Sequence, residues 1–186
     1  MTNFDYLKEE PKFSTFADVA ISAEKIILMD PQASVVNSRR AMEFAIKWMY
    51  SVEKSLAMPY QDNLYSLMSD SDFRQFVGED IWKRLDYIRA CGNTVAHTSR
   101  KSMLCLENLA IFLDFVACCY SRNYQEHIFD RGIINARIEK IKKSKQEAAA
   151  VQEELAKQKE HNAQQELDLK KLIEDIISVI EVQAAE

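Results

Sequence analysis

Apolar residues recur at intervals of three and four through the first 125 residues, which is the spacing of one buried helix face. Phe16, Ala20, Ala23 and Ile27 follow this spacing and predict a helix over residues 15–29. Asp30-Pro31 is typical of a helix start, because Asp caps free backbone N–H groups and Pro suits the first helical position. A second helix is therefore expected from residue 31 to about residue 55, with a buried stripe made of Ala41, Phe44, Ala45, Trp48, Met49 and Val52.

The pattern breaks at Met58-Pro59-Tyr60 and resumes in shorter segments. We expect short helices over residues 63–68 and 72–76, an interruption at Gly78, and a longer helix from about residue 79. The helix expected over residues 102–120 is apolar on nearly every face, which is typical of the centre of a bundle. The fold class is therefore all-α, and residues 1–125 are predicted to form one compact helical domain.

The composition changes after Gly132. We interpret residues 126–135 as a linker, and residues 136–186 predict a long charged helix because they contain no Gly, Pro, Cys or aromatic residue. Heptads with Ile138 at position a fit a coiled coil at both ends, but they place Lys159, Asn162 and Glu166 in the core of the middle. A solvated helix that pairs only at its ends is the simpler interpretation. Homodimerisation through this helix or through the bundle stays open.

Composition and charge exclude several classes of protein. The chain has three Gly and three Pro, too few for a β-sandwich, and its glycines are too widely spaced for a phosphate-binding loop. The net charge of −5 requires any nucleic-acid contact to be local. The four cysteines lack CxxC spacing and are expected to be reduced, small core residues. Reduced cysteines favour a cytoplasmic protein. The apolar stretch 109–119 is too short to cross a bilayer, so no membrane contact is expected.

One segment carries candidate chemistry, Arg89 to His97. If the helix continues, Arg89, Asn93 and His97 are four residues apart and share one face, where a guanidinium, a carboxamide and an imidazole converge. Such a face can hold a phosphate and move the proton of an RNA 2′-hydroxyl without a metal. The alternative is structural, because Gly92 permits close helix packing and Gly-Asn is a helix-stop signal. His127 and His161 lack partners at ligand spacing, so neither a metal site nor a cofactor is expected in this chain.

A second candidate is a local basic patch. It would form if the second and fourth helices are neighbours, although an ordinary solvated face is the better interpretation. The residues of this patch are Arg39, Arg40, Arg84, Arg89, Arg100 and Lys101. Together with Asn93 and His97 they are the candidate contacts to a nucleic acid or a partner. Aromatic residues that could stack on bases lie on apolar stripes and are expected in the core: Phe44, Trp48, Tyr50, Trp82 and Tyr87.

Four segments resemble one family. Arg89-x-x-Gly92-Asn93-x-x-Ala96-His97 is similar to the N-terminal helical domain of type I restriction endonuclease R subunits, long described as a domain of unknown function. The opening Phe4-Asp5-Tyr6-Leu7-Lys8, the segment Ala41-Met42-Glu43-Phe44-Ala45 and the segment Met103 to Leu109 resemble the same subunits. The resemblance covers nearly the whole chain, including a charged connector after the domain.

The resemblance implies a HEPN-like helical bundle. Catalytic HEPN proteins carry Arg, a polar residue and then His, and they act as dimers. In this chain Asn93 and His97 match the polar and His places. Gly92 stands at the Arg place, and Arg89 lies three residues earlier. The implied function is a non-catalytic interaction module of a restriction and phage-defence system, which contacts DNA or methyltransferase and specificity subunits. The alternative is a HEPN-type, metal-independent ribonuclease using Arg89, Asn93 and His97.

Full-length relatives continue into a nuclease core and a helicase motor, so the chain is expected to be a fragment or a stand-alone relative. ATP and Mg²⁺ are implied only for those full-length relatives, and the restriction activity of the family cannot be located on any residue here.

Overall fold

The computed structural model describes residues 1–93 and 99–183, and the chain divides into two compact units, Met1–Ala136 and Arg137–Glu186. The described residues form helices and connecting turns without a strand, so the all-α class is confirmed. The first unit contains two short 3-10 helices, η1 and η2, and five α-helices. Their bounds are η1 Asp5–Glu9, η2 Pro11–Phe13, α1 Ser14–Ile26, α2 Pro31–Val52, α3 Leu64–Ser69, α4 Ser71–Gly92 and α5 Ser99–Tyr120.

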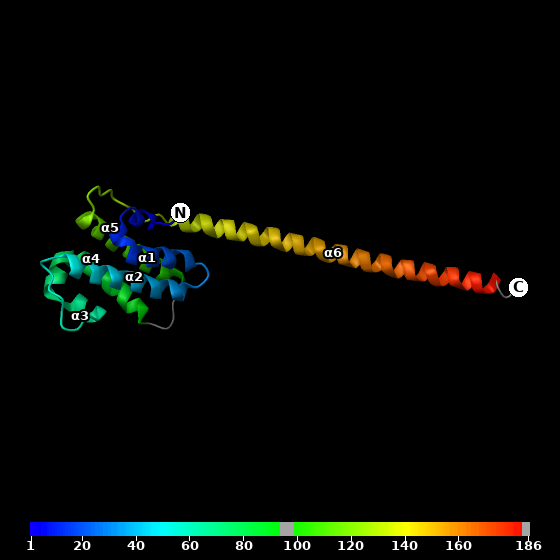
Figure 1. Cartoon of the computed structure of the whole chain (residues 1–186), viewed down its shortest axis with the longest axis horizontal. Coiled ribbons are helices and arrows are strands. Elements are labelled where there is room, and N and C mark those ends of the chain that lie inside the picture. Colours follow the sequence, from blue (N-terminus) through cyan, green and yellow to red (C-terminus); the bar gives the residue numbers. More distant parts are fainter. Residues whose placement is uncertain (94–98, 184–186) are drawn as a thin grey trace. The chain divides into compact units, whose positions relative to one another are not determined.

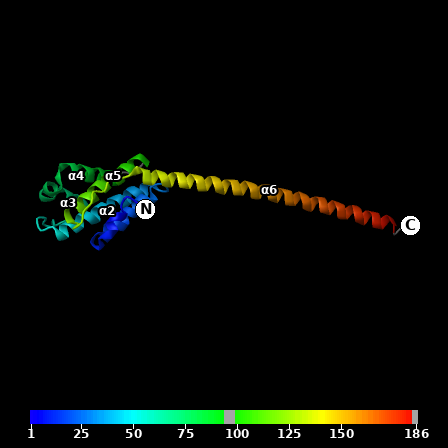
Figure 2. The same ribbon diagram turned by 90° about the horizontal axis from the view of Figure 1, so that it is seen from above.

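Helix α2 lies at the centre of the first unit, between α1 on one side and α4 and α5 on the other (Figures 1 and 2). The expected start is confirmed, because the Asp30 carboxylate accepts a hydrogen bond from the Ala33 N–H at 2.9 Å. The expected end is three residues too long, and Val52 is wrong as a buried residue since it is 45% exposed. Met42 and Ile46 are buried as well, because a helix covered from several sides hides more than one stripe.

Helix α4 consists of two segments joined at Gly78, whose φ of 79° and ψ of 162° interrupt the helical conformation. A positive φ of this kind favours glycine, which explains the break expected at this position. The short helix α3 packs before α4 and is tied down at its C-terminal end. There the Tyr50 hydroxyl donates to the Leu67 carbonyl and the Trp82 indole N–H donates to the Met68 carbonyl, both at 2.8 Å.

Helix α5 is the apolar core helix that the sequence predicts. It buries nine residues, among them Leu106, Leu109, Phe112 and Leu113. By length and composition alone this helix could cross a membrane, but half of its apolar window is buried inside the protein, as in the core helix of a bundle. The expectation that all cysteines are core residues is wrong for Cys118 and Cys119, which are exposed on the last turn of α5. Cys91 and Cys105 are buried as expected.

Residues 126–135, which we expected to be a linker, lie within the first unit. Ile134 is fully buried, and Phe129 packs against the same core. The Asn3 side chain accepts a hydrogen bond from the Asp130 backbone N–H at 2.6 Å and donates one to the Asp130 carbonyl at 3.2 Å. The first residues of the unit are thus joined to its last ones.

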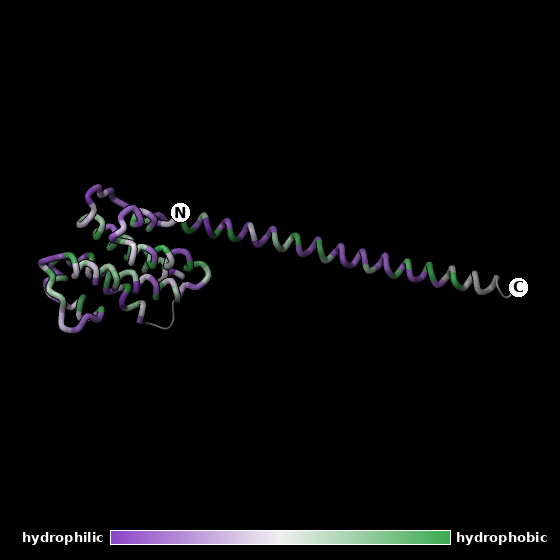
Figure 3. The backbone as a smooth tube through the Cα atoms, in the orientation of Figure 1, coloured by the Kyte–Doolittle hydropathy of each residue, from purple (hydrophilic) through white to green (hydrophobic). Residues whose placement is uncertain are grey.

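Helix α6 (Arg131–Gln183) begins in the first unit and makes up the second. The long helix expected from residue 136 is confirmed. Every described side chain of this helix from residue 139 onward is exposed, and Figure 3 shows apolar residues recurring along it between polar ones.

Candidate interaction surface

Helix α4 stops in the middle of the candidate ribonuclease segment. Its last residue is Gly92, and Asn93 is the C-cap, with its backbone N–H directed to the carbonyls of Ala90 and Cys91. The helix-stop interpretation of Gly-Asn is thus confirmed, and the shared helical face required α4 to continue beyond it. His97 belongs to residues 94–98, which lie outside the described residues.

Arg39 of α2, and not Arg89, is the arginine that meets Asn93. The Arg39 Nη1 donates a hydrogen bond to the Asn93 Oδ1. Arg89 instead binds Asp86 on its own helix, with Nε and Nη2 at 2.9 and 2.6 Å from the same carboxylate oxygen, and its guanidinium lies 5.9 Å from the centre of the Tyr65 ring. The two residues that the sequence placed on one face therefore have different partners in the structure.

Gly92 explains how Arg39 reaches Asn93. A Cβ atom at position 92 would lie 2.6 Å from the Cδ atom of Arg39, well inside van der Waals contact. The side chain of Arg39 thus occupies the space beside Gly92, and the absence of a Cβ permits α2 and α4 to approach closely at this point. This matches the structural alternative for Gly92.

An apolar cluster beneath this contact fixes the positions of three helices. Val35 of α2, Cys91 of α4 and Cys105 of α5 are buried together, and Tyr87 packs against them. Burial raises the pKa of the Cys105 thiol far above its ordinary value, so this cysteine stays a neutral thiol. The Ser102 hydroxyl donates to the Pro31 carbonyl at 2.8 Å and joins the start of α5 to the start of α2.

The basic candidates divide into two groups. Arg84 is paired with Asp80 at 3.0 Å and also donates to the Asn108 side chain at 3.2 Å, while Arg89 is paired with Asp86. Carboxylates therefore neutralise these two arginines. Within the part of the chain that the structure describes, Arg39 and Arg40 form no ion pair, and Arg39 is bound only to a neutral amide.

Arg100 and Lys101 add two exposed cations in the first turn of α5. The positive charge of Arg100 reaches Tyr87 of α4: burial raises the pKa of the Tyr87 hydroxyl to about 12, and Arg100 opposes that shift. We call Arg39, Arg40, Arg100 and Lys101 the basic surface. Arg39 and Arg40 belong to α2, and Arg100 and Lys101 belong to α5. Cations of this kind can attract the phosphates of a nucleic acid or an acidic protein surface.

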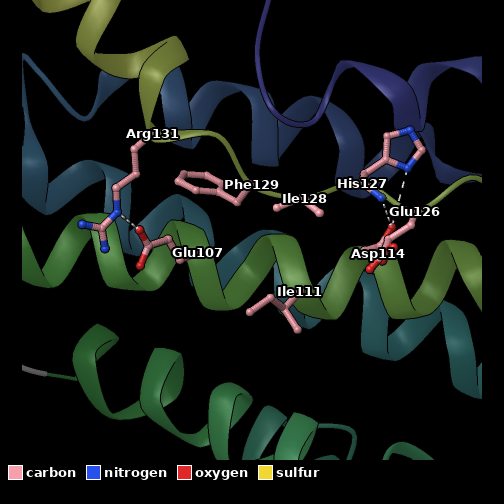
Figure 4. Close-up of a pocket in the computed structure, with 8 residues that line it drawn as sticks. All are labelled: Glu107, Ile111, Asp114, Glu126, His127, Ile128, Phe129 and Arg131. Carbon is pink, nitrogen blue, oxygen red and sulfur yellow. Dashed lines mark hydrogen bonds and ion pairs between the residues drawn. The ribbon is translucent and has the colours of Figure 1, made fainter.

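A groove of about 580 Å³ lies on another side of the first unit, between α5 and residues 126–131 (Figure 4). Arg131 is paired with Glu107 at one end, and His127 lies beside Asp114 at the other, with 3.6 Å between the His127 Nδ1 and the carboxylate. The side chains of Ile111, Ile128 and Phe129 lie between these pairs.

Asp114 is the anchor of this groove. Its carboxylate accepts hydrogen bonds from the Tyr124 hydroxyl at 2.7 Å and from the His127 backbone N–H at 3.0 Å, and the His127 ring stacks on Tyr6 at 3.7 Å. The sequence did not predict this contact, because His127 lies in the segment expected to be a linker. A usable signal existed, because an Asp within the apolar stretch 109–119 needs a polar partner.

Metal-binding chemistry has no support in the described residues, where no three His, Cys, Asp or Glu side chains converge. The aromatic residues proposed for the core are confirmed in it or packed against it: Phe44, Trp48, Tyr50, Trp82 and Tyr87.

The described residues form a small all-helical domain, which carries the four cations of the basic surface, and a long charged helix. The chain belongs to the family described as Domain of unknown function (DUF4145), whose model matches residues 22–144 and so includes α2, α4, α5 and the start of α6. No curated protein and no solved structure shows a significant match to the chain.

Proposed function

We propose that the chain is a non-catalytic interaction module of a type I restriction endonuclease R subunit, with a HEPN-like bundle that contacts DNA or a methyltransferase or specificity subunit in the cytoplasm. The proposal rests on which arginines have a carboxylate partner. Arg89, which a catalytic face would need, is bound to Asp86, while Arg39 and Arg40 have no carboxylate partner within the described residues. Cations without a local partner are the usual contacts to phosphate groups.

The location of these cations also supports a contact role. Arg40 is exposed, and Arg39 is held in place by Asn93 and by the space beside Gly92. A guanidinium that is fixed before binding loses less conformational entropy when it meets a phosphate or a carboxylate. Helix α6 then either carries the next part of the protein away from the bundle or pairs with another chain as a coiled coil.

The test is binding of duplex DNA to the full chain, followed by fluorescence anisotropy at stated salt. Replacement of Arg39, Arg40 and Arg100 by Gln is expected to weaken binding at least tenfold. The matched control is Arg84→Gln with Arg89→Gln, which removes two arginines that carboxylates already neutralise, and it is expected to change affinity by less than about threefold. Circular dichroism checks that both variants stay folded.

Capture of purified methyltransferase or specificity subunits is the parallel measurement, with the same variants. A loss of subunit capture in the triple variant, without any DNA binding by the wild type, identifies the partner as protein. If the wild-type chain binds neither DNA nor a subunit, the proposal is wrong.

The second candidate is a HEPN-type ribonuclease that acts as a dimer. One observation favours it: a guanidinium does lie beside Asn93, but it comes from Arg39 on α2 rather than from Arg89. This candidate requires RNA cleavage in the presence of a metal chelator, and it requires that His97→Ala and Arg39→Ala each abolish cleavage. Intact RNA after incubation with folded, dimeric wild-type protein excludes it.

A further inference from the structure

Helix α6 has an apolar face whose side chains are exposed to solvent in the single chain. Leu172 and Ile173 lie three and four residues after Leu169, and Ile177 lies four residues after Ile173; the four side chains Leu169, Leu172, Ile173 and Ile177 are 58, 56, 54 and 49% exposed. Removal of such apolar surface from water is favourable in proportion to the area that is buried. Pairing with a second apolar helix is therefore strongly favourable for this segment.

The charges of the same helix are divided between its two ends. Residues 137–145 contain five basic residues and one acidic residue, a net charge of +4. Residues 166–181 contain five acidic and two basic residues, a net charge of −3. Apolar heptad positions occur in both segments, with Ile138 and Ile141 in the basic one and Leu169 and Ile173 in the acidic one.

We propose that α6 pairs with α6 of a second copy of this chain in antiparallel orientation, so that the basic segment of each copy lies against the acidic segment of the other. In a parallel pair each segment would lie against the same segment of the second chain, and like charges would repel at both ends. Packed helices lie about 8–10 Å apart. This separation is close to the Debye length of about 8 Å at physiological salt, so the charge pattern contributes to the choice of orientation.

The polar middle of the helix agrees with this arrangement. Lys159 lies in the polar middle of the helix, and an antiparallel pair with its two-fold axis near residue 157 brings the two polar middles together. One register that packs a positions against d positions places Ile141 opposite Ile173 of the second copy. Both apolar ends are then covered at once, although the middle of the heptad pattern is poor.

Antiparallel pairing has a consequence for the bundles. The chain enters the paired region near residue 137, so the two entry points are separated by its length, roughly 65 Å for 45 residues at 1.5 Å each. The inference rests on the proposed function in one respect, that α6 is a pairing segment. If α6 does not pair, binding of DNA or of a subunit by the first unit can still hold.

The first test is the mass of the full chain by sedimentation equilibrium, where we expect a dimer of the 21.5 kDa chain. Replacement of Lys140, Lys142 and Lys143 by Glu changes the basic segment from +4 to −2 and is expected to weaken dimerisation at least tenfold. Lys8, Lys54 and Lys83 are exposed residues of the first unit, and their replacement by Glu makes the same change in net charge as a control that leaves the dimer intact.

The orientation is tested by cross-linking with a short bis-maleimide. In a chain whose exposed cysteines are removed (Cys118→Ser, Cys119→Ser), single cysteines are introduced as Ile141→Cys or Ile173→Cys. Antiparallel pairing gives cross-links when the two variants are mixed and little product from either alone. A monomer at all concentrations, a dimer unaffected by charge reversal, or cross-links within each single variant would overturn the proposal.

Discussion

Asp114 offers the sharpest test of how the first unit is held together. Its side chain is 18% exposed and accepts one hydrogen bond from Tyr124 and one from the His127 backbone. A hydrogen bond to a charged group contributes about 1.5–3 kcal/mol. Because both bonds are only partly buried, we take the lower value for each and expect Asp114→Ala to lower the free energy of unfolding by about 3 kcal/mol. Tyr124→Phe removes one bond and is expected to cost about half as much.

The assay is urea unfolding followed by tryptophan fluorescence. Trp48 and Trp82 both lie in the first unit, so the signal reports this unit and not the long helix. The control is Asp18→Ala, which removes an exposed ion pair with Lys8 at 3.1 Å and is expected to cost less than about 1 kcal/mol. If Asp114→Ala is no more destabilising than Asp18→Ala, the anchoring role of Asp114 is wrong.

Two further predictions follow from the packing of the first unit. Gly92→Ala places a Cβ 2.6 Å from the Arg39 Cδ and is expected to displace Arg39 from Asn93. The nuclear magnetic resonance signal of the Asn93 side-chain amide should then shift as it does in Arg39→Gln. An unchanged signal contradicts the contact. Burial, and for Tyr124 the hydrogen bond to Asp114, raises the pKa of five tyrosines above the ordinary value of 10.0: Tyr6, Tyr50, Tyr87, Tyr120 and Tyr124. The raised pKa values contribute fully to the stability of the folded state below pH 10, and this contribution is lost as the pH rises through the folded pKa values. Stability should therefore fall above pH 10, and phenolate absorbance of these residues should appear at a higher pH in the folded chain than in the unfolded one.

The elements that local patterns specify were predictable from the sequence. Asp30-Pro31 combines an N-cap with a first-turn proline, and the start of α2 lies where this pair predicts it. The interruption at Gly78 and the stop of α4 at Gly92 follow from residues at those positions. The nearly continuous apolar pattern of α5 indicated a core helix, because no face of it suits water.

Contacts between distant parts of the chain were not predictable in this way. The bond between Arg39 and Asn93 spans 54 residues, and it depends on the relative rotation of α2 and α4, which periodicity does not determine. Arg89 can pair either with Asp86, three residues before it, or with Asn93, four residues after it. The direction of its side chain decides between them, and the sequence does not show that direction. Residues 126–135 resembled a linker since they are short of apolar periodicity, yet Asp114 and Asn3 hold them to the unit by polar contacts.

If the basic surface contacts DNA phosphates, the salt dependence of DNA binding must depend on its arginines. The slope of log K against log salt concentration changes by about 0.9 for each phosphate contact. Replacement of Arg39, Arg40 and Arg100 by Gln is therefore expected to reduce the slope by nearly three, while the control at Arg84 and Arg89 leaves it unchanged. An unchanged slope in the triple variant, or an equal loss in the control, would contradict the account.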